Sequence, residues 1–364
     1  MKSRFRVSDE PEYVGRCETI YSNPYHAEPR VVQGRSRRLS GGSVSPGSPD
    51  SFAGRFRIAA MDRPVRVLGV PMDLGADRRG VDMGPSAIRY AGLTDEIESV
   101  GLDCVDDGDV PVPSPEQAES DGDRSLGGRA KYLESTERVC RRLADDVAAA
   151  VDDGHLPLVL GGDHSIAIGA VGGAARDRDV GVVWFDAHAD FNTPQTTPSG
   201  NVHGMSVAAF LGVGPFADTD WAPAAGVDAE NVAMVGLRSV DGAEGDALRD
   251  SDVTTYTMND VDQRGLPDVT REALSVASDG TDKVHVSLDM DFLDPTEAPG
   301  VGTPVRGGVS YREGHTAMEV VSRTLGPQLL SMELVEVNPI LDDHNRTAEL
   351  GVELAASALG KRIL

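Results

Sequence analysis

The chain has 364 residues and carries 59 acidic against 34 basic side chains, a net charge of −25. This length allows one large α/β domain, or two small ones, with a full hydrophobic core. So acidic a chain argues against a nucleic-acid partner, and no run approaches the about 18 consecutive apolar residues that a membrane helix needs. Because the acidity is spread along the chain, we predict a halophilic protein whose surface repulsion is screened by salt.

The first 60 residues differ in composition from the rest. They hold 10 Lys and Arg against six Asp and Glu, a net charge of +4, and include SGGSVSPGSP, a linker-like sequence. Two interpretations stay open: a disordered basic tail, or a segment foreign to the natural protein, whose start would be Met61. Either way, we predict that residues 61–364 form a single domain.

The three cysteines, Cys17, Cys104 and Cys140, are scattered and show no paired spacing. This pattern argues for a reducing compartment, the cytoplasm, and against a structural zinc site.

Apolar strand-like runs alternate with helical patterns from residue 65 onward. Strands are predicted at 65–70, 156–160, 181–185, 230–237, 283–288 and 329–337. Helices are predicted at 85–99, 129–153, after a capping Ser165, and at 267–279, 311–325 and 345–359. This alternation predicts an α/β fold with a doubly wound, mostly parallel sheet and helices on both faces, in three α/β/α layers. Reactive groups of such sheets gather beyond the carboxyl ends of the strands.

Three predicted strands end in ionisable residues. They are Asp163 and His164 after 156–160, Asp186, His188 and Asp190 after 181–185, and Asp289 and Asp291 after 283–288. Alternate residues of a strand share a face, so each set can aim into one crevice if the extended geometry persists beyond the strand.

One aspartate after a strand is usually a turn or a helix cap, but this set is harder to explain in that way. The carboxylates of Asp186, Asp190, Asp289 and Asp291, together with two imidazoles, would repel at neighbouring strand ends. Burying an unpaired ion costs of order several kcal/mol. Two divalent cations would neutralise the four aspartates. Oxygen-rich ligation with one imidazole per ion favours a hard ion such as Mn²⁺. Because two adjacent ions can share and activate a water molecule, the pattern predicts a binuclear metallohydrolase and leaves the substrate open.

Longer motifs show a family resemblance. GGDHS, DAHAD, SGNVHGM and SLDMDFLDP, in this order, resemble the ureohydrolase superfamily and, within it, the bacterial-type arginases. PMDLGADRRGVDMGPSAIRYAGL (71–93), GTPVRGGVSYREG (302–314) and VEVNPILD (335–342) extend the resemblance over about residues 65–364. It implies hydrolysis of L-arginine to L-ornithine and urea, with a metal-bridging hydroxide attacking the guanidinium carbon. It also implies a homotrimer or homohexamer.

The resemblance also implies roles for individual residues at the metal centre. His164, Asp186, Asp190 and Asp289 would hold one Mn²⁺, and Asp186, His188, Asp289 and Asp291 the other, with Asp186 and Asp289 bridging. Three residues are predicted to be catalytic: Asp190, His203 as the proton shuttle to the leaving amine, and Glu313 as the partner of the guanidinium.

The polar loop after Asp190 is implied to select the substrate. Three side chains, Asn192, Ser199 and Asn201, would bind the α-carboxylate. Asp241 and Glu244 would face the α-amino group, and Thr303 would line the pocket. Some family members have Asp where this chain has Ser239, so arginine selectivity would depend more on Asp241. For each of these residues a loop-stabilising turn is the alternative.

Other functions stay open. The nearest alternative is a ureohydrolase of agmatine or another guanidino compound, but agmatine has no carboxylate for Asn192 and Ser199 to bind. Another is a non-catalytic, metal-stabilised binding protein, against which His203 and Glu313 argue because neither is an expected metal ligand. Nucleic-acid binding through the basic first 60 residues is the weakest alternative.

Overall fold

The computed structural model describes residues 62–118 and 126–362, so the interpretation of residues 1–60 lies outside the described part. Within it, eight parallel strands form one sheet in the order β2-β1-β3-β8-β7-β4-β5-β6. The strands are β1 (Val65–Val70), β2 (Cys104–Asp109), β3 (Leu156–Gly161), β4 (Val180–Phe185), β5 (Val232–Leu237), β6 (Thr254–Thr257), β7 (Lys283–Asp289) and β8 (Leu329–Val335).

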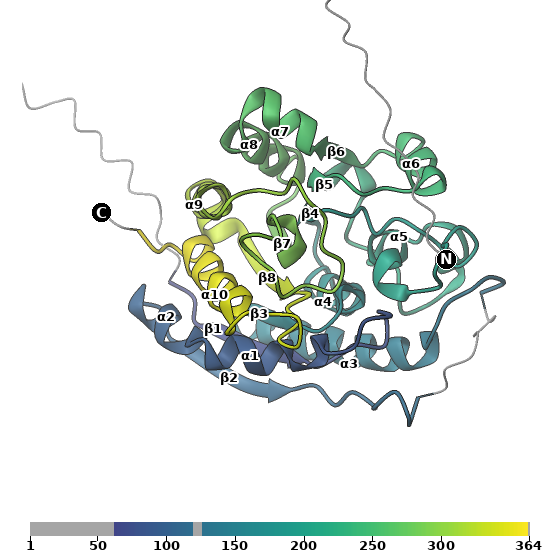
Figure 1. The fold of residues 1–364 in the computed structure, drawn as a ribbon, viewed down its shortest axis with the longest axis horizontal. Coiled ribbons are helices and arrows are strands. Elements are labelled where there is room, and N and C mark those ends of the chain that lie inside the picture. Colours follow the sequence, from purple (N-terminus) through teal and green to yellow (C-terminus); the bar gives the residue numbers. More distant parts are fainter. Residues whose placement is uncertain (1–61, 119–125, 363–364) are drawn as a thin grey trace, which may run out of the picture. The chain divides into compact units, whose positions relative to one another are not determined.

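Helices cover both faces of this sheet. The α-helices are α1 (Gly84–Tyr90), α2 (Leu93–Ser99), α3 (Leu133–Asp152), α4 (Ala167–Ala174), α5 (Ser206–Phe210), α6 (Gly242–Arg249), α7 (Met258–Arg264), α8 (Leu266–Ala277), α9 (Tyr311–Leu325) and α10 (Arg346–Ala358). Short 3₁₀ turns are η1 (Val81–Met83), η2 (His164–Ile166), η3 (Val202–Met205), η4 (Gly214–Asp218), η5 (Ala229–Asn231), η6 (Met290–Phe292) and η7 (Gly326–Gln328). In Figure 1, α9 and α10 lie on one side of β7 and β8, and α4 and α5 on the other. The predicted doubly wound α/β fold is therefore confirmed.

Side-chain alternation along the strands creates two hydrophobic cores. In β4, Val183 and Phe185 pack into the core beneath α8, α9 and α10, whereas Val182 and Trp184 pack into the core beneath α3, α4 and α5. Both faces of a central strand are thus apolar, which explains why its sequence reads as a continuous hydrophobic run.

Several elements differ from the sequence prediction. The helix predicted at 85–99 is two helices, α1 and α2, because the chain turns at Gly92, whose φ of 88° is unfavourable for other residues. The edge strands β2 and β6 were missed because CVDDGD and TTYT have no buried apolar run. Ser165 does not cap the turn after β3; the Asp163 side chain does, by accepting a hydrogen bond from the Ser165 N–H. No helix in the described residues is long and apolar enough to cross a membrane.

Candidate metal centre and substrate pocket

The predicted metal ligands meet at one edge of the sheet. β3, β8, β7 and β4 are neighbours in this order, and all four run in the same direction. His164 follows β3, Asp186 follows β4, and Asp289 ends β7. The carboxyl ends of these strands therefore bring Asp289 close to two residues that lie more than a hundred positions earlier in the sequence.

His164 lies at the centre of the first group of ligands. Its Nδ1 lies 3.1 Å from Asp186 Oδ2, 3.2 Å from Asp190 Oδ2 and 3.1 Å from Asp289 Oδ2. All four residues are buried, yet His164 Nδ1 makes no hydrogen bond. A buried imidazole nitrogen that faces three carboxylate oxygens without hydrogen bonding fits a divalent cation held among them.

A second group of ligands adjoins the first. His188 Nδ1 lies 3.0 Å from Asp291 Oδ2 and 3.6 Å from Asp186 Oδ1. Asp186 thus faces both histidines, one with each carboxylate oxygen, as the predicted bridging position requires. Potential ligand atoms of His164, Asp186 and Asp289 lie within 4.8 Å of one another, as do those of Asp186, His188 and Asp291. Asp289 is in the first of these sets only, so its predicted bridging role stays a prediction.

The ligands converge by tight turns. The extended geometry does not persist beyond the strands: β4 ends at Phe185, and Asp190 has a left-handed φ of 48°. Asp291 lies in η6, where its N–H donates a hydrogen bond to Asp289 Oδ1 at 2.7 Å. The alternation argument therefore selected residues that lie close together, but their geometry differs from the one expected. A left-handed non-glycine residue at this point is the kind of local strain found at functional sites.

Neighbouring side chains fix the ligands in orientation. The Trp184 indole N–H donates to Asp186 Oδ2 at 2.9 Å, and its ring stacks on His164 with the ring centroids 3.9 Å apart. The Thr303 hydroxyl donates to Asp291 Oδ2 at 2.9 Å. Such contacts restrict the orientation of ligands before an ion binds.

Burial and mutual repulsion raise the pKa of Asp289 and Asp190, whereas His164 and His188 lower that of Asp186. Burial, together with the charges of Asp291 and Asp186, raises the pKa of Asp289 well above its ordinary value. Burial and the charge of Asp186 raise the pKa of Asp190 to about 6. Bound cations would remove this repulsion, which again fits a metal centre.

A second buried polar group lies beneath His164, between β7 and β8. His164 Nε2 shares a hydrogen bond with Ser287 Oγ at 2.7 Å, and Glu333 Oε1 lies 3.5 Å from His285 Nε2. His285 and Glu333 are fully buried, and both Glu333 oxygens lack a hydrogen bond. The sequence analysis did not single out this pair, because both residues sit inside predicted strands.

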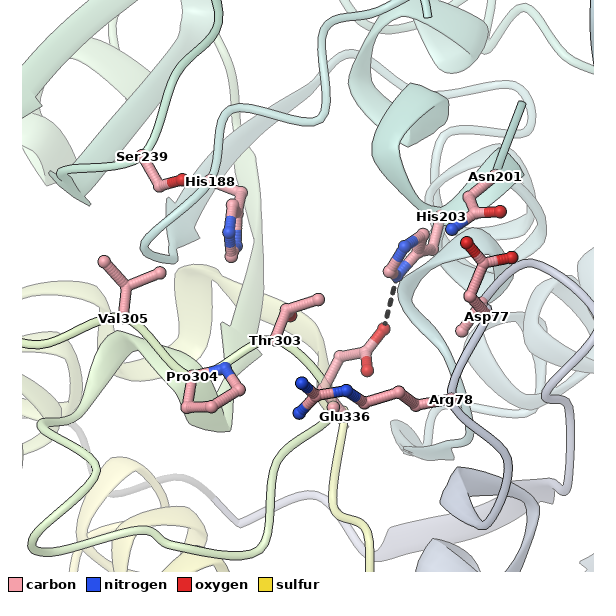
Figure 2. A pocket seen from close by; sticks show the side chains of 12 residues that line it. Asp77, Arg78, His188, Asn201, His203, Ser239, Thr303, Pro304, Val305 and Glu336 are labelled. Carbon is pink, nitrogen blue, oxygen red and sulfur yellow. Dashed lines mark hydrogen bonds and ion pairs between the residues drawn. The ribbon is translucent and has the colours of Figure 1, made fainter. Parts of the chain in front are cut away.

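His203 is paired with a glutamate that the sequence analysis missed. Its Nδ1 lies 3.0 Å from Glu336 Oε1, which also accepts a hydrogen bond from the His164 backbone N–H at 3.0 Å (Figure 2). Burial lowers the pKa of His203, but Glu336, with smaller contributions from Asp190 and Asp163, outweighs this effect and raises it to about 9. Glu336 Oε2 is buried without a hydrogen bond, and its carboxylate lines the same hollow as His203. The available signal was its position directly after a buried strand, in VEVNP.

Glu313 lies elsewhere, so its predicted place in the pocket is wrong. It is exposed in the first turn of α9, where its carboxylate accepts a hydrogen bond from the Ser310 N–H at 2.8 Å. The Ser310 side chain accepts one from the Glu313 N–H in return, forming a capping box. The Ser-Tyr-Arg-Glu sequence of residues 310–313 thus forms the N-terminal capping box of α9.

The loop of residues 192–203, here called the substrate loop, lies beside the ion-binding residues. Asn192 Nδ2 donates to Asp241 Oδ2 at 2.8 Å, and the Asn201 N–H donates to Ser199 Oγ at 3.1 Å. Asp241 also caps α6, and Glu244 accepts a hydrogen bond from the Phe191 N–H at 2.9 Å. Burial and nearby carboxylates raise the pKa of Glu244 to about 7. These residues thus make the turn-stabilising hydrogen bonds of the alternative, and their contacts with a substrate stay predictions.

Two adjoining hollows connect the metal centre with the loop. One, of about 390 Å³, is lined by Asn201, His203, Thr303 and Glu336 among others, and Figure 2 shows these side chains around it. The other, of about 240 Å³, is lined by candidate metal ligands and by residues near the loop, including His164, Asp190, Asn192, Asp241, Glu244 and Asp289. His188, His203, Ser239 and Thr303 line both. Ser199 is exposed and lines neither hollow.

Comparison with known proteins agrees with this geometry. The arginase family model matches residues 63–360. The chain is 46% identical to the arginase of Bacillus caldovelox over 306 residues, which is 83% of this chain and 100% of that protein. The crystal structure of B. caldovelox arginase superposes with a TM-score of 0.77, covering 83% of this chain and 100% of that one at 44% identity. An Entamoeba histolytica arginase structure in complex with L-ornithine gives a TM-score of 0.74, with the same coverage and 31% identity. The chain is therefore a member of the arginase family and a hydrolase of amidine C–N bonds.

Proposed function

We propose that the protein hydrolyses L-arginine to L-ornithine and urea. The observation that carries this proposal is a carboxylate next to a candidate two-ion centre: Glu336 Oε2, buried and without a hydrogen bond, beside His203 in the same hollow. A guanidinium is a planar cation that pairs with a carboxylate. A β-carbon at residue 302 would lie 3.3 Å from Glu336 Oε2, so Gly302 keeps this oxygen open to a ligand.

Two divalent ions would be held by His164, Asp186, Asp190 and Asp289 on one side and by Asp186, His188, Asp289 and Asp291 on the other. When bound, such ions supply an activated water molecule and orient the carbon that it attacks. The oxygen-rich donor set, with one imidazole per ion, suits Mn²⁺.

The chain's own residues would position the substrate and move one proton. The Glu336 carboxylate would hold the guanidinium, the role first expected of Glu313. A C–O bond forms and a C–N bond breaks, and His203 would deliver the proton to the departing ornithine amine. The Glu336 charge, which raises the pKa of His203 to about 9, keeps that imidazole protonated near neutral pH.

The substrate loop would recognise the other end of arginine. Asn192, Ser199 and Asn201 would bind the α-carboxylate directly or hold its binding groups in place. Asp241 and Glu244 would face the α-amino group, while Thr303 lines the pocket and holds Asp291. Agmatine, the alternative substrate, lacks the carboxylate, so a loop built to bind one favours arginine.

Further features of the protein belong to the same proposal. Residues 61–364 would form a single catalytic domain, acting as a homotrimer or homohexamer in the cytoplasm. The net charge of −25 supports a halophilic protein without a nucleic-acid partner.

Urea release by the purified protein tests the proposal. The protein is loaded with Mn²⁺ in high salt and given arginine or agmatine under identical conditions. Faster release from arginine, lost after chelation and restored by Mn²⁺, is the expected result. Faster release from agmatine would contradict the choice of substrate.

A further inference from the structure

We propose that Lys131 is a specificity-determining residue, which holds the substrate loop and supplies the positive charge that favours a substrate with a carboxylate. This inference rests on the proposed function, because it assigns a role toward the α-carboxylate of arginine. Lys131 lies just before α3, more than sixty residues before the loop, and none of the resembling motifs includes it.

A short segment, residues 126–131, runs along the substrate loop and binds it through backbone contacts. The Arg129 N–H donates to the Pro194 carbonyl at 2.6 Å, and the Lys131 N–H donates to the Gly200 carbonyl at 2.8 Å. The Arg129 side chain donates to the Thr197 and Pro198 carbonyls at 3.0 and 2.8 Å. We call this segment the strap. It fixes the loop at both ends and along its middle.

The strap approaches the loop too closely for larger residues. A β-carbon at Gly128 would lie 2.1 Å from the Pro194 carbonyl oxygen. Gly200 has a φ of 81°, which favours glycine, and lies next to the side-chain carbons of Arg129 and Lys131. This close fit places the Lys131 backbone in register with the loop residues expected to bind the substrate.

The ammonium group of Lys131 contacts two residues that line a hollow, although Lys131 itself lines neither hollow. Its Nζ donates to Asn201 Oδ1 at 2.8 Å and to Asp77 Oδ1 at 2.6 Å. Asn201 is 8% exposed, and both Asn201 and Asp77 line the hollow that contains His203 and Glu336. The hydrogen bond fixes the Asn201 oxygen toward Lys131, so the Asn201 amide N–H groups face another direction. Figure 2 shows this amide nitrogen next to the Asp77 carboxylate, whose pKa is lowered by Lys131 and by Asn201.

The charge of Lys131 stands out in this protein. The chain has only four lysines and a net charge of −25, a field that repels a carboxylate. The pocket itself contains the carboxylates of the metal centre, Glu336 and Asp77. Arg129 donates to backbone carbonyls and Arg78 is an exposed residue at the hollow, whereas Lys131 contacts a loop side chain expected to bind the carboxylate. A fixed cation at this position would offset the repulsion for arginine and give agmatine no advantage.

The test compares three variants of the full protein, loaded with Mn²⁺, on two substrates. Lys131→Met removes the charge, Lys131→Arg keeps it, and Lys361→Met is a matched control in which a lysine paired with Glu96 is removed far along the chain. For Lys131→Met we expect KM for arginine to rise about tenfold, as for loss of a charge-assisted contact, with kcat changing less than about twofold. The constants for agmatine and the bound metal should stay near those of the unmodified protein.

Each outcome decides a separate point. Lys131→Arg should recover most of the affinity for arginine, and Lys361→Met should behave as the unmodified protein does. An unchanged ratio of kcat/KM for arginine over agmatine in Lys131→Met would overturn the role of Lys131 alone. An equal loss on both substrates, or a loss of metal, would show that the residue only supports the fold. If the unmodified protein prefers agmatine, the proposed function fails, and this inference fails with it.

Discussion

The ion-binding residues and the substrate loop are adjacent, but they are held in place by different interactions. The ligands sit on the ends of β3, β4 and β7 in the middle of the sheet, with both hydrophobic cores behind them. The loop is held by hydrogen bonds from the strap and from the start of α6. On the proposed function, the ends of the strands would provide the chemistry, and the loop would provide the choice of substrate. Changes in the two regions should therefore affect different measured quantities.

The largest effect is expected from loss of a metal ligand. Asp289→Ala removes a buried carboxylate that faces His164 Nδ1 and should lower turnover by more than about 10³-fold, equivalent to about 4 kcal/mol. Urea release and metal content, measured on the same sample, should fall together. Asp282→Ala, exposed at the other end of β7, is the matched control and should change neither. Full metal content with unaltered turnover in Asp289→Ala would remove this residue from the centre.

A smaller effect is expected from a change at Glu336, the residue proposed to bind the guanidinium. Glu336→Gln keeps the shape of the side chain but removes its charge, which should lower kcat/KM about 10²-fold while bound metal is retained. Glu313→Gln is the matched control, since glutamine also completes a capping box, and it should leave activity unchanged. The reverse pattern, with activity lost only in Glu313→Gln, would restore the role first expected from the sequence.

The residues expected to bind the α-carboxylate and the α-amino group can be distinguished by choice of substrate. Ser199→Ala should lower kcat/KM for arginine about tenfold and kcat/KM for agmatine much less, because only arginine has a carboxylate. Asp241→Asn should lower kcat/KM for both substrates, because arginine and agmatine both carry the amine. The kcat/KM values on each substrate provide the measurement. Equal responses of the two substrates to Ser199→Ala would leave Ser199 as a turn residue only.

The smallest effect concerns stability. Glu313→Ala breaks the capping box of α9 and should lower the free energy of unfolding by about 1 kcal/mol, without affecting urea release. Denaturant unfolding of the unmodified protein, Glu313→Ala and Glu313→Gln measures the difference in the free energy of unfolding. A stability equal to that of the unmodified protein would show that the box contributes nothing.

The sequence predicted the sheet and the clustering of the candidate ligands because both depend on local pattern. Buried strands read as apolar runs, and several carboxylates directly after such strands would repel one another unless cations bind between them. The polar edge strands β2 and β6 lack an apolar run. Glu336 was missed for a related reason: a single glutamate after a strand acquires meaning only when β8 is known to lie between β3 and β7. Glu313, in contrast, was chosen by motif resemblance, and its local capping interaction was overlooked.

The substrate loop shows where sequence reasoning stops. Its polar residues were identified, but their partners lie in distant segments: Asp241 at the start of α6, and Arg129 and Lys131 in the strap. No local pattern relates residues 126–131 to residues 192–203. Such contacts come from the three-dimensional arrangement of the strands and helices.

One measurement tests the central claim most directly: urea release from arginine and agmatine by the Mn²⁺-loaded protein in high salt, with metal analysis of the same sample. We predict two ions per chain and a kcat/KM for arginine well above that for agmatine. A protein that binds metal but releases urea faster from agmatine, or from neither, would contradict the account.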